Sequence, residues 1–177
     1  MKKKPELLKG ALAGALGGLL GAWLMNYSHQ AWRKGMDLFQ EAIGDEDDEA
    51  SQRDDESSED ENATAKVAEA ISETVFRHKL TDDERKPASI AVHFGFGASM
   101  GALYGAIAEI EPRATFASGI PFGTVLWLGA DEVVVPVAGF SKNPGQYPIS
   151  THADALMAHL VFGLTTDLVR RGVRSIG

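Results

Sequence analysis

The feature that most constrains this chain is a set of apolar segments that are each about as long as a membrane is thick. About 20 residues of helix cross the hydrocarbon core of a bilayer. Four segments approach that length, over residues 7–27, 88–110, 116–138 and 153–169. We therefore predict an all-α fold, a four-helix transmembrane bundle. The fourth segment is the least apolar because Asp154, His159 and Asp167 interrupt it, so these side chains are expected to face protein or water.

Glycines recur at helical spacing in the first two segments. In a water-exposed helix each glycine costs about 1 kcal/mol relative to alanine. In a membrane the small-xxx-small spacing lets two helices approach backbone to backbone. We therefore predict that the first two helices pack together through glycine faces. The predicted packing glycines are Gly10, Gly14, Gly18, Gly97, Gly101 and Gly105.

Acidic residues are concentrated in one run. The mean hydropathy is −0.12 and the net charge is −8, but 11 of the 25 acidic residues lie between Asp45 and Glu61. So charged a run is expected to stay disordered. After it, Val67, Ala68, Ile71 and Val75 share one side at helical spacing, which predicts a short amphipathic helix on the membrane surface or against the bundle.

Three regions follow from these patterns. Residues 1–32 hold the basic N-terminus and the first transmembrane helix, and 33–87 form an extramembrane acidic loop, partly disordered, with the short amphipathic helix. Residues 88–177 hold three further transmembrane helices and a basic C-terminus. The sequence "TDDE" at Thr81–Glu84 is typical of a capping box, and predicts the start of the lead-in to the second span.

The distribution of basic residues predicts the orientation. The positive-inside rule places both termini in the cytoplasm, which requires an even number of spans, and it places the acidic loop outside. A cleaved signal peptide is the alternative interpretation of the first segment, although Trp23, Tyr27 and Trp32 resemble the aromatic belt of a retained span. The basic residues before the first span and after the last are Lys2, Lys3, Lys4, Lys9, Arg170, Arg171 and Arg174.

Ionisable side chains in the predicted spans are the candidate functional residues, because such groups are costly in a membrane. His-x-x-Phe-Gly occurs twice, which places His93 and His159 at matched depth on two parallel helices and suggests two related hairpins. Of the adjacent Asp131 and Glu132, only one is expected to face inward, because neighbours lie about 100° apart on a helix. The predicted polar intramembrane cluster is His93, His159, Asp131, Glu132 and Asn26. The predicted charge cluster at the inner interface is Glu109, Arg113, Asp167, Arg170 and Arg171.

One further set of residues runs through the last three predicted spans and the turns between them. It consists of His93, Phe96, Tyr104, Ala108, Glu109, Pro112, Pro136, Gly139, His159, Leu160, Asp167, Arg170 and Arg171. Together these residues resemble the YagU-like uncharacterised bacterial inner-membrane proteins, a family defined by a domain of unknown function (DUF1440). The resemblance covers residues 88–174, the first span only loosely and the acidic run not at all. Asp167 stands where the family carries Glu, and the Asp131–Glu132 pair is particular to this chain. The resemblance implies a multi-span protein of the bacterial inner membrane without an established reaction.

Three functional hypotheses follow. The first is a structural or accessory membrane protein whose polar groups hydrogen-bond between helices. The second is a proton or ion relay through the polar cluster. The third is haem or metal binding between His93 and His159, although a cofactor is not otherwise predicted and metal binding is undetermined.

An enzyme is not expected. The chain has no cysteine, which excludes a thiol nucleophile and a thiolate metal site. No basic, aromatic-interleaved surface points to nucleic acid. The expected partners are the lipid bilayer and either a second copy or another membrane protein.

Overall fold

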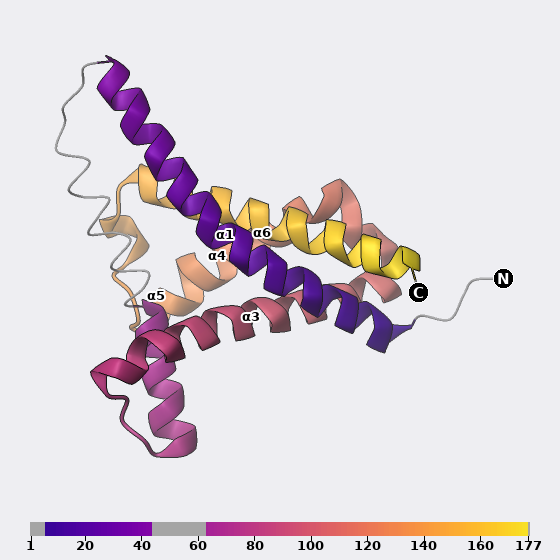
Figure 1. Ribbon diagram of the computed structural model, residues 1–177, viewed down its shortest axis with the longest axis horizontal. Coiled ribbons are helices and arrows are strands. Elements are labelled where there is room, and N and C mark those ends of the chain that lie inside the picture. Colours follow the sequence, from indigo (N-terminus) through magenta and orange to yellow (C-terminus); the bar gives the residue numbers. More distant parts are fainter. Residues whose placement is uncertain (1–5, 44–62, 177) are drawn as a thin grey trace.

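The computed structural model describes residues 6–43 and 63–176, and these residues form helices joined by short turns (Figure 1). No strand occurs in these two ranges, which agrees with the predicted all-α fold. The acidic run Asp45–Glu61, and with it the predicted disorder, lies outside the described residues. The long helices are α1 (Leu7–Ile43), α3 (Asp82–Ile110) and α6 (Ile149–Ile176), with the shorter α4 (Ile120–Gly129). The remaining elements are η1 (Ser72–Phe76), η2 (Pro112–Gly119), η3 (Ala130–Val134), α5 (Val135–Val137) and η4 (Pro144–Gln146).

Within the described part of the chain, three stretches are long and apolar enough to cross a membrane. They are Leu7–Trp32, Asp82–Ile110 and Pro112–Val137. The fourth predicted span falls within α6, which is helical throughout but carries Asp154 and Asp167 along its length and Arg174 in its last turn. The count of four spans therefore stays a prediction.

Two helices are longer than the sequence predicted. α1 continues to Ile43, because the residues after Trp32 include good helix formers and no proline. α3 begins at Asp82, directly after its N-cap residue Thr81. The predicted capping box between Thr81 and Glu84 is confirmed. Both extensions lie within residues 33–87, so more of that region is helical than the sequence indicated.

The four main helices form a bundle in which α1 packs against both α3 and α6, and α4 packs against α6 (Figure 1). α3 and α6 run in the same direction, opposite to α1. We call the end where α3 and α6 begin the histidine end, and the end where they finish the arginine end. Stacked rings of Tyr104 and Phe122, with centroids 4.5 Å apart, join α3 to α4.

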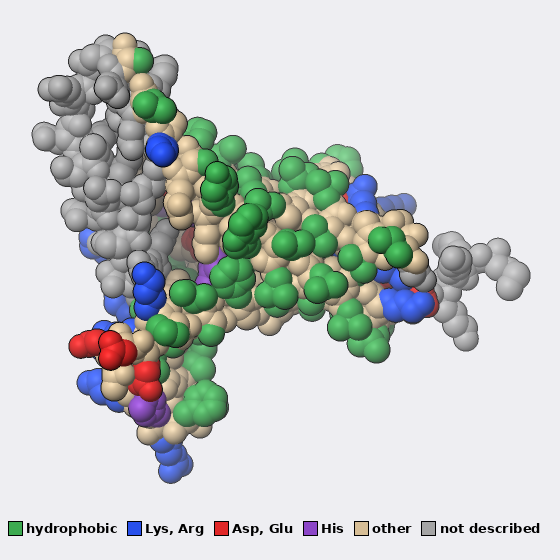
Figure 2. All heavy atoms as spheres, viewed as in Figure 1, with side chains coloured by type: hydrophobic (Ala, Val, Ile, Leu, Met, Phe, Trp, Pro, Cys, Tyr) green, Lys and Arg blue, Asp and Glu red, His purple; other side chains and the backbone are tan. Residues whose placement is uncertain are grey.

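Apolar side chains cover the surface of the bundle between charged ends (Figure 2). This is the distribution expected where lipid rather than water surrounds the helices. Examples of large exposed side chains on three helices are Leu12, Leu16, Leu20, Leu103, Val125 and Leu128.

Backbone atoms of facing glycines form the contact between α1 and α3, which we call the α1–α3 seam. A Cβ atom added at Gly14 would overlap the carbonyl of Gly101, and one added at Gly18 would overlap the carbonyl of Gly97. Gly10 and Gly105 meet in the same way nearer the arginine end. Each helix thus approaches the other as closely as two main chains can.

A second seam joins α4 to α6. A Cβ atom at Gly119 would overlap the carbonyl of Gly163, and one at Gly123 would overlap the carbonyl of His159. Gly119 has φ 81°, a left-handed conformation that glycine adopts without a steric penalty. It follows Ala117 and Ser118, which are also left-handed, in the bend that turns the chain into α4.

The predicted amphipathic helix is present. Residues 63–71 are helical and continue into the π turn η1. Ala68 and Ser72 are buried, whereas Ile71 and Val75 are exposed. The predicted apolar side is therefore only partly covered by protein: Ala68 is buried, and Ile71 and Val75 stay exposed.

Candidate functional site

Titratable side chains from α1, α3, η3 and α6 gather at the histidine end. They form three histidine–carboxylate contacts and three histidine–carbonyl contacts, described below. Each histidine–carboxylate contact joins side chains on different elements. We call this set the histidine cluster: His29, His93, Asp131, Glu132, His152, Asp154 and His159.

His159 lies at the centre of the cluster. Its side chain is 7% exposed, and its Nδ1 atom is 3.5 Å from Oδ2 of Asp131 on η3. The same nitrogen is 3.0 Å from the carbonyl of Ala155, one turn earlier on α6. His93 on α3 points its Nε2 atom at the carbonyl of Ala22 at 3.3 Å, and it lies close enough to His159 for their charges to interact.

α1 contributes His29 rather than the predicted Asn26. Nδ1 of His29 is 2.9 Å from Oδ2 of Asp154 on α6, and both side chains are 24% exposed. Asn26 is exposed on α1. The contact from α1 therefore comes one turn further along the helix than we predicted.

His152 connects three elements. Its Nδ1 atom is 2.6 Å from Oε1 of Glu132 on η3, and its Nε2 atom is 3.1 Å from the carbonyl of Pro144 on η4. Both ring nitrogens thus face oxygen acceptors. An imidazole donates from both nitrogens only when it is protonated, so both hydrogen bonds form together only with a charged His152 or a protonated Glu132.

The π turn η3 explains why both adjacent carboxylates reach histidines. The N–H of Val135 bonds to the carbonyl of Ala130, five residues back. Pro136 follows, and its ring would clash with the carbonyl of Glu132 in a regular helix. The prediction that only one of Asp131 and Glu132 faces the bundle was wrong, because the widened turn directs both towards α6.

A second ionic group lies at the arginine end, around Asp167 of α6. This carboxylate is fully buried. Arg170 holds one oxygen, with Nη2 at 3.0 Å, and Nη2 of Arg171 lies 2.7 Å from the other. The guanidinium of Arg171 also donates to the carbonyl of Thr115 at 2.9 Å, which ties α6 to η2.

Tyr104 of α3 completes this group. Its ring is 2% exposed and lies under the guanidinium of Arg170, 5.9 Å from ring centroid to Cζ. The buried hydroxyl lies beside the carboxylate of Asp167 without a hydrogen bond of standard geometry. Tyr104 thus links α3 to the charged groups of α6.

Glu109 pairs with a residue that we did not predict. Nε of Arg174 donates to Oε1 of Glu109 at 2.8 Å, and its Nη2 donates to Glu6 at 3.0 Å. Lys9, followed by Arg174, holds the pKa of the Glu6 carboxyl below its usual range through direct hydrogen bonds. Arg113, which we expected beside Glu109, is exposed and donates its backbone N–H to Glu111.

The two predicted cofactor ligands, His93 and His159, contact protein atoms. Nitrogens of His93 and His159 face backbone carbonyls. Among the described residues, no group of three or more His, Asp or Glu side chains is arranged to hold a metal ion. Haem or metal binding between His93 and His159 stays a hypothesis.

Sequence reasoning missed His152 as a member of the histidine cluster and did not pair His29 with Asp154. A signal was present for His152, since it precedes His159 by seven residues, two turns on the same face of a helix. His29 and Asp154 required knowledge of which helices are neighbours.

One family matches the chain. It is described as "Protein of unknown function (DUF1440)", and the match covers residues 57–168. No curated protein and no solved structure matches the chain.

Proposed function

The chain belongs to the DUF1440 family, and on that premise we propose that it is an integral protein of the bacterial inner membrane with a structural or accessory role. It is not an enzyme in this proposal. Its helices associate through glycine faces, within the bundle and with either a second copy or a partner membrane protein.

The seam between α1 and α3 is the observation that carries the proposal. Gly10, Gly14 and Gly18 meet the backbone of α3 so closely that an added Cβ would overlap it. In a membrane no hydrophobic force draws two apolar helices together, so close backbone packing supplies much of the attraction. The same close packing occurs at three levels, from Gly10 to Gly18, over about two turns of α1, and this repetition supports a role in helix association.

We propose that α6 crosses the membrane as a fourth span, which puts both termini in the cytoplasm. Its polar side chains support this, because His159 and Asp167 are 5% and 0% exposed. Polar groups that face protein can be accommodated within a span. Reporter domains fused after Gly177 and within the loop 138–148 should lie on opposite sides of the membrane, whereas the same side for both would contradict four spans.

A complementation experiment tests the structural role. In cells whose phenotype depends on this protein, His93→Ala and His159→Ala should restore function, because interhelical hydrogen bonds average only about 0.6 kcal/mol. Gly101→Leu should fail. Gly95→Leu on the same helix is the matched control, because an added Cβ at Gly95 meets nothing within 4 Å. Loss of function in the histidine variants with normal membrane levels would contradict a purely structural role.

A proton or ion relay is the second candidate, and the histidine cluster favours it. Two of its three histidine–carboxylate pairs use carboxylates of the π turn η3, and the third joins α1 to α6; π turns in helices are frequent at functional sites. Histidine also titrates nearest to physiological pH. Proton flux into liposomes should then fall in His159→Ala and Asp131→Asn, and flux that is unchanged in both variants would remove this candidate.

A further inference from the structure

Residues 63–80 form a hairpin that projects sideways from the bundle, which we call the projecting hairpin. Helix 63–71 runs into η1, Arg77 turns the chain with φ 54°, and the chain returns to α3. The buried hydroxyl of Ser72 donates to the carbonyl of His78 at 2.8 Å and closes the turn. Figure 1 shows this helix running across the long direction of the bundle, beside the first turns of α3. A helix that crosses the direction of the spans lies parallel to the membrane plane.

Polar contacts attach the hairpin to the bundle. Nζ of Lys66 donates to the carbonyl of Phe140 at 3.1 Å, and Arg85 of α3 pairs with Glu69 at 3.3 Å. These contacts join the hairpin to the chain after α5 and to the start of α3. The position of the hairpin is therefore set by the protein, before any lipid is considered.

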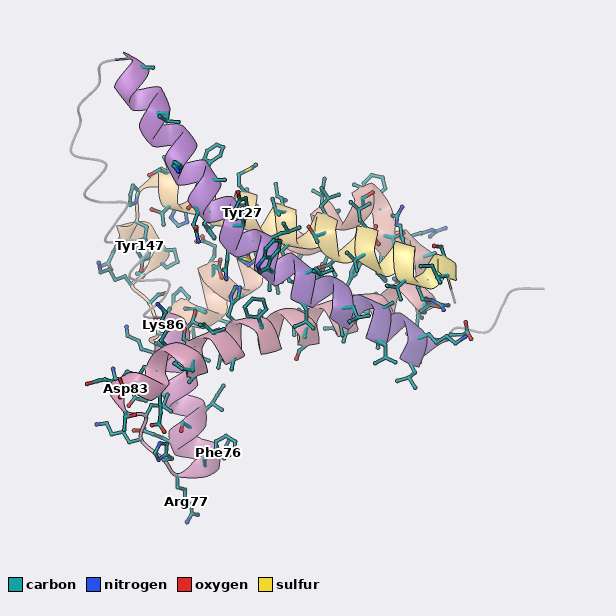
Figure 3. All side chains as sticks on the ribbon, viewed as in Figure 1. Tyr27, Phe76, Arg77, Asp83, Lys86 and Tyr147 are labelled. Carbon is teal, nitrogen blue, oxygen red and sulfur yellow. The ribbon has the colours of Figure 1, made fainter. Side chains whose placement is uncertain are left out.

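The hairpin exposes a cluster of large apolar side chains. Ile71, Val75 and Phe76 are 44%, 66% and 73% exposed. In Figure 3, Phe76 points to the side towards which α3 runs, whereas Asp83 lies on the opposite side. The apolar side of the hairpin therefore faces along the bundle, towards the level at which the bundle surface is apolar, and charged side chains cover its other side (Figure 2).

The length of α3 places the hairpin at the level of lipid headgroups. α3 has 29 residues and is thus about 43 Å long, whereas the hydrocarbon core is about 30 Å thick. Its first five residues, 82–86, are all charged. This first turn therefore stands outside the hydrocarbon, and the hairpin lies beside it.

We propose that the projecting hairpin is an interfacial anchor for the bilayer that holds the rest of the chain. Ile71, Val75 and Phe76 insert among the lipid chains just below the headgroups, in the manner of an in-plane amphipathic helix. The exposed Arg77 and Lys79 are positively charged and therefore complement the negative charge of lipid phosphates. This inference rests on the proposed membrane location and adds a second mode of lipid contact to the spans.

The absence of cysteine from the sequence makes a site-directed spin-label experiment direct. Single labels are placed at Val75→Cys and, on the opposite side of the helix two residues away, Glu73→Cys. Leu128→Cys on α4, 53% exposed, reports the lipid contact of a span, and Phe76→Cys repeats the apolar position if Val75→Cys folds poorly. Each protein is reconstituted in vesicles that contain anionic lipid, and collision with oxygen is compared with collision with a water-soluble nickel chelate.

The label at Val75 or Phe76 is expected to collide at least threefold more with oxygen than with the nickel chelate, and the label at Glu73 should show the reverse. If Leu128 contacts lipid while Val75 and Phe76 are open to the chelate, the anchor is wrong and the membrane location stands. If Val75 and Phe76 are shielded from both reagents, a protein surface covers the hairpin and the anchor is also wrong. If Leu128 itself is open to the chelate, both the anchor and the proposed function fail.

Discussion

The two helix seams of this protein both depend on contact between glycine and backbone, but different side chains surround the contacts. Between α1 and α3, glycine meets glycine at three successive levels. Between α4 and α6, Gly119 and Gly123 meet a helix that carries His159 and Asp167 at the same levels. The glycine contacts of the first seam are backbone against backbone, with Glu109 and His93 only towards its two ends, and the second seam combines close packing with buried charge.

This difference separates assembly from chemistry in the molecule. Contacts between glycine backbones contribute packing but no proton transfer and no ligand. Close approach at the α4–α6 seam brings η3 and η2 onto α6, which is why Asp131 contacts His159 and Thr115 contacts Arg171. Any activity beyond packing is therefore expected around the α4–α6 seam. Changes at the two seams should differ in their effects on stability.

The largest effect is expected from Gly101→Leu in the seam between α1 and α3. Overpacking usually costs about 1–3 kcal/mol, and here about 4 kcal/mol or more is expected because the obstacle is main chain that cannot rotate away. For a chain of this size that lowers the unfolding midpoint in detergent by roughly 8–16 °C. Gly95→Leu, the control on the same helix, should shift it by no more than about 2 °C. Equal shifts in the two variants would show that the seam does not hold α1 to α3.

Asp167→Asn should have the next largest effect, and it changes the second seam and the charged group at the arginine end. It leaves the guanidinium of Arg170, a residue 8% exposed, without its counter-charge. Breaking such a buried pair costs about 3–5 kcal/mol, and the lower end is expected because asparagine still accepts a hydrogen bond. The unfolding midpoint should fall by roughly 6–12 °C, and a midpoint within 2 °C of the parent would show that the charge of Asp167 is not needed.

Thr81→Ala changes a position outside both seams. It removes the hydroxyl of the capping box that opens α3, at a cost of about 1 kcal/mol. Amide hydrogen exchange should rise in the first turn of α3 and stay unchanged at Gly97–Gly105, with Thr81→Ser restoring the parent pattern. Faster exchange at the glycines would mean that the start of α3 and the seam unfold together.

The smallest effect is expected from the contact between Asp131 and His159. A double-mutant cycle of Asp131→Asn and His159→Ala, followed by thermal unfolding, should give a coupling of about 0.6 kcal/mol, the average for polar contacts between membrane helices. A coupling above about 2 kcal/mol would exceed that range and would indicate that the pair does more than join η3 to α6.

The sequence predicted those features that depend on local spacing. Runs of apolar residues indicated the helices, the capping box located the start of α3, and the four-residue glycine spacing identified the residues that now lie between α1 and α3. His159 and Asp131 were also identified as candidates, because an ionisable group within an apolar segment stands out without any knowledge of neighbours.

The remaining features depend on contacts between distant segments. The pairing of His29 with Asp154, 125 residues away in the chain, follows only from the placement of α1 beside α6. Glu109 was assigned to Arg113 because the two are close in sequence, whereas the bundle brings Arg174 to it. The π turn before Pro136 changed the direction of Glu132, and regular helical spacing could not show that.

The distance between α1 and α3 tests the central claim most directly. Leu12 and Leu103 are exposed and lie at the same level of the glycine seam, so spin labels at Leu12→Cys and Leu103→Cys report its closure without disturbing it. In lipid nanodiscs, pulsed electron–electron resonance should give one narrow distance distribution, which Gly101→Leu broadens or lengthens and Gly95→Leu leaves unchanged. A broad distribution in the doubly labelled parent protein, or a narrow one that survives Gly101→Leu, would contradict the account.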